Sequence, residues 1–132
     1  MPSDPEIRAH LPSLRVSLFL NIARPDGRQD REDDIVRDFM DHFRRTQWPG
    51  ESAPEIYYDP RSLGRDHATR AVLHAKCIVV DDHKAFVTSA NLTTAAERNI
   101  EAGVLIEDGG LAHSLRMQFE TLVGAGILKP AL

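Results

Sequence analysis

The stretch 74–91, HAKCIVVDDHKAFVTSAN, decides the fold that we expect for this chain. Its apolar run at 77–80 is typical of a buried strand. The polar residues at 81–84 predict a turn, and the residues at 85–89 predict a second strand. The stretch therefore predicts a hairpin-like unit with polar side chains at its open end.

Side chains alternate between the two faces of a strand, so His74 and Lys76 should share one face. Asp81 should point to the opposite face, and we interpret it as a structural residue. If the chain stays extended after the turn, Ser89 and Asn91 share a face as well. The hairpin can then bring an imidazole, an ammonium, a hydroxyl and an amide to one place.

These four groups suit the binding and attack of a phosphate. Lys76 and Asn91 donate hydrogen bonds to anionic oxygens, and Ser89 adds another donor. His74 is of the type that can attack phosphorus or pass a proton near neutral pH. Each residue alone has an ordinary explanation: a surface histidine, a solvated lysine, or a helix cap. Their combination predicts a phosphoryl site that needs no metal and no cofactor.

Eight residues share the spacing of a known motif: His74, Lys76, Asp81, Thr88, Ser89, Asn91, Asn99 and Glu101. This spacing resembles the HKD motif of the phospholipase D superfamily, followed by the Asn-x-Glu that this family often carries. The family usually has glycine where this chain has Thr88. The amino-acid sequences of the stretch 88–93 and of the run 99–106 are most similar to those of phospholipase-D-like proteins found beside prokaryotic phage-defence genes, such as the DISARM component.

The resemblance implies an α/β fold, with a mixed β-sheet flanked by helices, and a phosphodiesterase that forms a phosphohistidine. In the family mechanism one histidine attacks phosphorus and a second protonates the leaving oxygen. This chain has one HxK, at His74, so the resemblance implies a homodimer that shares its active site. Lys76 and Asn91 would hold the phosphate oxygens, and Ser89 would assist.

Glu101 is a carboxylate within the run 99–106, which should be a mostly buried strand. A buried acid needs a partner. In the family such a residue accepts a hydrogen bond from the catalytic histidine, so the resemblance gives Glu101 the role of orienting His74. The alternative is that Glu101 marks a solvated edge.

We favour a nucleic acid, either DNA or RNA, as the substrate, because short single-motif relatives are often nucleases. Two alternatives stay open: a phospholipid or other small phosphodiester, and a non-catalytic nucleic-acid-binding subunit of a defence complex. The net charge of −4 argues against a strong non-specific binder of nucleic acid. Arg61, Arg65 and Arg70 precede the motif and form either a phosphate-binding lip or an ordinary surface connection.

The chain has 132 residues, 42% of them hydrophobic, which suits one domain over 1–132. Residues 1–13 hold three prolines and are predicted to be a flexible arm. Cys77 is the one cysteine, so no internal disulfide can form. No signal peptide and no membrane-spanning run is visible, and we therefore expect a reducing, cytoplasmic location without membrane attachment.

The remaining elements follow from hydrophobic periodicity. They are a strand at 15–22, a helix at 31–48, a strand at 55–59, a short helix from 92, and a helix at 111–123. Strands that alternate with helices in this order predict the α/β class.

Overall fold

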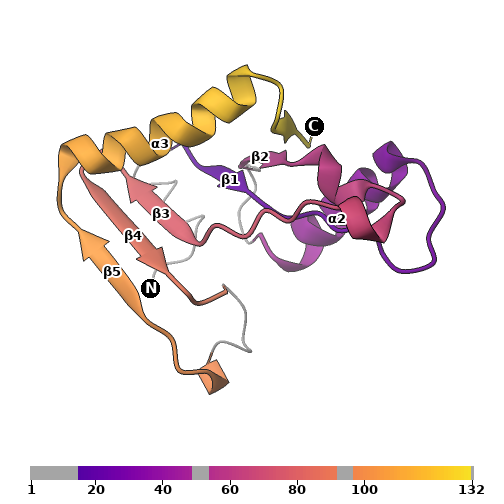
Figure 1. Cartoon of the computed structure of the whole chain (residues 1–132), viewed down its shortest axis with the longest axis horizontal. Helices are drawn as coiled ribbons and strands as arrows, with labels where there is room; N and C mark the ends of the chain where they lie inside the picture. The colour runs from indigo at the N-terminus through magenta and orange to yellow at the C-terminus, as the bar shows by residue number, and fades with distance from the viewer. Residues whose placement is uncertain (1–14, 49–53, 92–96, 132) are drawn as a thin grey trace. The chain divides into compact units, whose positions relative to one another are not determined.

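The computed structural model describes residues 15–48, 54–91 and 97–131, shown as ribbons in Figure 1. They form two compact units. The first unit runs to Leu73 and includes the residues from Ile127 on, and the second unit is His74–Gly126. The predicted α/β class is confirmed, with the strands divided between a mixed sheet and an antiparallel sheet of three strands each. That the chain forms a single domain stays a prediction, and the arm at 1–13 lies outside the described residues.

The first unit is built on the sheet β1-β2-β6. Its elements are β1 (Ser17–Phe19), α2 (Glu32–Thr46), β2 (Glu55–Tyr58), two short 3-10 helices (Pro60–Leu63 and His67–Thr69) and β6 (Lys129–Pro130). Strands β1 and β2 are parallel, and β6 joins β2 in the antiparallel direction. Parallel neighbours need a crossover connection, and the segment that contains α2 provides it.

Helix α2 follows the predicted amphipathic pattern. Its apolar stripe enters the core of the first unit, where the buried members are Ile22, Ile35, Val36, Met40, Ile56, Tyr58, Leu63 and Ala131. Acidic residues occupy the first turn of α2 and two arginines its last turn, which matches the helix dipole. The helix is shorter at both ends than the predicted range 31–48, and the N-cap residue Arg31 makes no side-chain capping bond.

Arg24 is a buried cation that the sequence did not point to. Its Nε donates to the carbonyl oxygen of Leu63 at 2.8 Å, and its Nη1 donates to those of Asp30 at 2.8 Å and Arg28 at 3.2 Å. A buried charge must be hydrogen-bonded to be tolerated. Arg24 therefore ties the connection between β1 and α2 to the 3-10 helix Pro60–Leu63.

The second unit contains the predicted hairpin, which is confirmed. Strands β3 (Cys77–Val80), β4 (Lys84–Thr88) and β5 (Gly103–Ile106) form an antiparallel sheet, followed by helix α3 (Gly109–Gly124). At the turn after β3, Asp81 and Asp82 have φ of 52° and 54°. Turns with two left-handed residues match the twist of hairpin strands, and aspartate tolerates this conformation.

Asp82 also links this turn to α3. Its carboxylate accepts hydrogen bonds from Nε and Nη2 of Arg116, the latter at 2.6 Å. It also accepts one from Nδ1 of His113 at 3.0 Å. The Arg116 guanidinium and then the His113 imidazole hold the pKa of Asp82 well below its usual range. This contact fixes the orientation of the hairpin on the helix.

The predicted burial of the strand at 77–80 is wrong, because two of its four residues, Ile78 and Val80, are exposed. Ala85 of β4 and Ala112 of α3 are fully buried, and α3 contacts both β3 and β4. On the other face of the sheet, Ile78, Phe86 and Leu105 lie opposite one another and are 47%, 37% and 60% exposed. One helix covers one face only, so the second unit leaves an apolar sheet face open. No helix among the described residues is long and apolar enough to cross a membrane.

Candidate functional site

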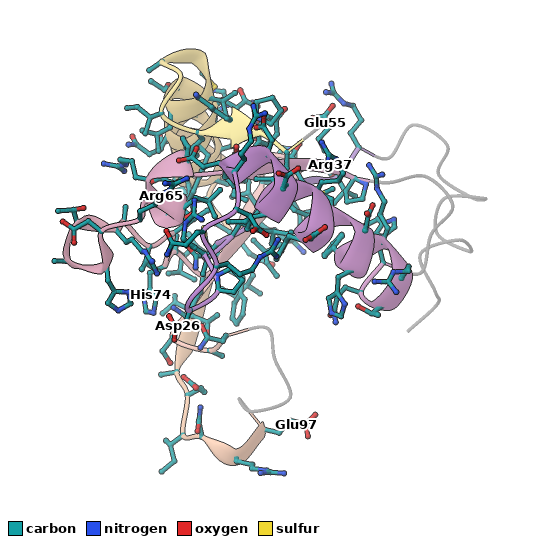
Figure 2. All side chains as sticks on the ribbon, turned by 90° about the vertical axis from the view of Figure 1, so that its right-hand side faces the viewer. Asp26, Arg37, Glu55, Arg65, His74 and Glu97 are labelled. Atoms are coloured by element: carbon teal, nitrogen blue, oxygen red, sulfur yellow. The ribbon has the colours of Figure 1, made fainter. Side chains whose placement is uncertain are left out.

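The motif pair His74 and Lys76 lies just before β3, and the structure brings the two side chains together. Nζ of Lys76 is 3.1 Å from each ring nitrogen of His74 and donates to the His74 carbonyl oxygen at 2.9 Å. The Lys76 carbonyl oxygen accepts from the Thr88 amide at 3.0 Å, which holds this segment on β4. His74, labelled in Figure 2, is exposed, and Lys76 is half-buried.

This arrangement leaves donors available for an anion. An ammonium carries three protons, and Lys76 uses one of them on the carbonyl oxygen of His74. A neutral imidazole has one nitrogen with a free lone pair, so only one of the two ring contacts can be a hydrogen bond at a time. Lys76 can therefore keep its hold on the backbone while it donates to a phosphate oxygen beside the imidazole.

Ser89 and Glu101 form the second part of the site. The Ser89 hydroxyl donates to Oε2 of Glu101 and accepts from the Ala102 amide at 3.1 Å. The Ser89 amide donates to the Ala102 carbonyl oxygen at 3.0 Å. Nδ2 of Asn99 donates to Oε1 of Glu101 at 3.1 Å. Asn99 was not among the predicted site residues, although the Asn-x-Glu spacing pointed to it.

Glu101 is held as an anion. The Ser89 hydroxyl and then the Asn99 amide lower the pKa of Glu101, desolvation opposes them by less, and the Lys76 charge lowers this pKa by the smallest amount. Glu101 is half-buried and precedes β5, so the predicted strand at 99–106 begins only at Gly103. Within the part of the chain that the structure describes, Glu101 has no hydrogen bond with His74. That Glu101 orients His74 stays a prediction.

Asn91 and Asp81 are the remaining predicted motif residues. Asn91 is exposed and follows β4, and the short helix predicted from 92 lies outside the described residues, which resume at 97. Asp81 is exposed in the turn at the far end of β3 from His74. A strand rises about 3.3 Å per residue, so Asp81 is separated from the motif pair by the length of β3. That Asp81 is a structural residue stays a prediction.

The three arginines before the motif belong to the first unit and contact its own groups. Arg61 pairs with Asp59 at 2.7 Å, and Arg65 donates to the carbonyl oxygen of Gln29 at 3.3 Å. Nε of Arg70 donates to the carbonyl oxygen of Gly64 at 2.6 Å. Substrate binding by Arg70 therefore stays a prediction. In the described ranges, no three His, Cys, Asp or Glu side chains are grouped to hold a metal ion.

One of the comparisons with known proteins gives a match. A family model described as cardiolipin synthase, PLD-like domain, matches residues 31–123, more than two thirds of the chain. The matched range includes the whole motif from His74 to Glu101. No match was found among the curated proteins or among the solved structures. The family model indicates phosphodiesterase-type chemistry, and the chain belongs to the family of PLD-like domains.

Proposed function

We propose that this chain is a metal-independent phosphodiesterase that acts through a phosphohistidine, with a nucleic acid as its substrate. The observation that carries the proposal is the pairing of an exposed His74 with the Lys76 ammonium. The Glu101 carboxylate accepts hydrogen bonds from two donors, and the charge of Lys76 lowers its pKa. A nucleophile, a cation and an oriented anion are the groups that such a reaction needs.

The proposed reaction has two steps. A ring nitrogen of His74 attacks phosphorus, the P–N bond forms and the bond to the leaving oxygen breaks, while a second imidazole gives that oxygen a proton. Water then attacks phosphorus and gives a proton to the second imidazole, and the P–N bond breaks. Lys76 and Asn91 stabilise the negative charge on the phosphate oxygens, as a metal ion would in a metal-dependent enzyme.

The second imidazole comes from another copy of the chain in this proposal. The support is that the sequence holds one HxK, at His74, whereas the chemistry uses two histidines. In a symmetric dimer the two His74 side chains face each other across the twofold axis. His74→Ala protein is then inactive, and each mixed dimer lacks one of the two roles.

A mixing experiment tests both the activity and the shared site. Wild-type and His74→Ala chains are mixed at several ratios, subunit exchange is confirmed by mass, and hydrolysis of bis(p-nitrophenyl) phosphate is measured. Total activity should follow the square of the wild-type fraction. Activity per wild-type chain that stays constant at every ratio would rule out the shared site, and a wild type without turnover would rule out the phosphodiesterase.

The alternative substrate class is a phospholipid. Two observations favour it: the description of the matching family names cardiolipin synthase, and the β3-β4-β5 sheet leaves apolar side chains exposed. Turnover of single-stranded DNA, RNA and cardiolipin vesicles by the same preparation separates these substrates. A chain that binds DNA or RNA but hydrolyses none of the three is instead a non-catalytic binding subunit.

The proposed setting is a prokaryotic phage-defence complex. This setting is supported by the amino-acid sequence of the motif, which is similar to that of phospholipase-D-like proteins found beside defence genes. The test is phage plating on cells that carry the complete gene cluster with either wild-type or His74→Ala protein. Equal plating efficiency on both would refute a role of this site in defence.

A further inference from the structure

The Ser89 hydroxyl has no proton left for a substrate. A hydroxyl carries one proton and two lone pairs, whereas an ionised carboxylate only accepts hydrogen bonds. The proton between Ser89 and Glu101 must therefore come from the serine. The Ala102 amide occupies one of the lone pairs of the same hydroxyl oxygen, at 3.1 Å. In this arrangement the hydroxyl offers no proton to a phosphate, which argues against the interpretation of Ser89 as a further donor.

Asn99 occupies the other oxygen of the same carboxylate. Its Nδ2 donates to Oε1 of Glu101, whereas Ser89 donates to Oε2. A carboxylate offers about four lone-pair sites, so each oxygen keeps about one for another partner. Because both oxygens are held, the direction of these remaining lone pairs is fixed. A free carboxylate at this half-exposed position would rotate.

We infer that Ser89 and Asn99 are positioning residues that hold the Glu101 carboxylate in one orientation, and that neither is a ligand of the substrate phosphate. The inference deepens the proposed function and rests on it for its effect on catalysis. Ser89 is twelve residues from Glu101 in the chain, and Asn99 only two. The site thus depends on the end of β4 being held against the segment before β5.

The electrostatics agree with this geometry. Hydrogen bonds from Ser89 and then Asn99 are the two largest causes of the lowered pKa of Glu101. Lys76 is the charged group that acts on the carboxylate, and it lowers this pKa further. Removing either donor should therefore raise the pKa of Glu101, and removing Ser89 should raise it more.

The direct test is a titration of the Glu101 carboxyl carbon by NMR in the full chain. Ser89→Ala and Asn99→Ala should raise the pKa of Glu101 in that order of size, and Ser89→Thr, which keeps a hydroxyl, should restore the wild-type value. Ser114→Ala, a serine exposed on α3, is the matched control and should leave it unchanged. An unchanged pKa of Glu101 in both Ser89→Ala and Asn99→Ala would overturn the inference.

Kinetics separate positioning from phosphate binding. The free energy that a hydrogen bond to a charged group contributes corresponds to a loss of about ten-fold to a hundred-fold in kcat for each alanine variant. KM should stay near that of the wild type. A raised KM with an unchanged pKa of Glu101 would instead make Ser89 and Asn99 phosphate ligands. An inactive wild type that still shows the pKa changes would refute the proposed hydrolysis and support the positioning.

Discussion

Replacement of Glu101 by glutamine removes one negative charge and keeps the shape of the side chain. The glutamine oxygen can still accept from Nδ2 of Asn99. Its amide nitrogen can donate to the Ser89 hydroxyl oxygen, which has a second lone pair beside the one taken by the Ala102 amide. The Ser89 hydroxyl proton loses its acceptor on Oε2, but Ser89 is exposed and its hydroxyl can turn to water, so glutamine leaves no buried donor unpaired. We therefore expect a folded protein in which only the charge has been lost.

The magnitude follows from what that charge does in the proposed reaction. If Glu101 orients His74, it also stabilises the imidazolium that forms there, which an amide cannot do. Loss of the equivalent charge in hydrolase triads lowers kcat by about ten-thousand-fold. Glu101 is only half-buried, so water screens its charge more than in a buried triad. We expect a loss in kcat between about a hundred-fold and that upper value.

The assay compares kcat for bis(p-nitrophenyl) phosphate with the melting temperature of the same preparation. Glu107→Gln is the matched control, since Glu107 is an exposed glutamate after β5 that pairs with Lys84 at 3.4 Å. The control should keep wild-type kcat. Wild-type kcat in Glu101→Gln, with an unchanged melting temperature, would show that the Glu101 charge has no part in catalysis.

Three further predictions concern chelation, the buried arginine and the turn. Activity should persist in excess EDTA, because Lys76 and Asn91 supply the positive charge and hydrogen bonds; a loss that added metal restores would contradict this. Arg24→Met should lower the free energy of unfolding by about 3 kcal/mol in urea, because the carbonyls held by Arg24 lose a charged donor; the exposed control Arg31→Met should change it little. The hydrogen bonds that lower the pKa of Asp82 stabilise the fold at pH values above 3.8, which is the ordinary pKa of this carboxyl group. This stabilisation is lost as the pH falls through the pKa of the folded state. Asp82→Asn should therefore lower the melting temperature at pH 7 and weaken its dependence on pH below 4, and equal melting curves at pH 7 would contradict the role of the ion pair.

Local patterns were sufficient for the hairpin and for α2. The apolar run at 77–80 is followed by turn-forming residues, and the apolar residues of α2 recur at helical spacing, so each element is encoded within its own segment. The pairing of His74 with Lys76 is equally local, because alternation along an extended chain places both on one side. The fold class followed from the order of such segments.

Contacts between distant segments could not be predicted in this way. Asp82 and Arg116 are 34 residues apart, and Arg24 and Leu63 are 39 apart. Each contact depends on how two elements pack, which periodicity does not specify. The Ser89 hydroxyl is a similar case, because its partner is set by the register between β4 and β5. The residue type alone predicted that Ser89 donates to the phosphate, whereas in the structure its hydroxyl donates a hydrogen bond to Glu101.

The exposed face of β3 bears on the proposed dimer. By alternation, His74 and Lys76 fall on the same face as Ile78 and Val80, which are 47% and 50% exposed. An apolar run is compatible with a strand covered on both faces and with one covered on a single face, which is why the sequence predicted a buried strand. A surface that covers Ile78 and Val80 would also lie beside His74. If a second copy supplies the second imidazole, burial of this face and completion of the site would occur in one association step. Substitution of Ile78 by lysine should then weaken association and activity together, without a change in the His74 side chain itself.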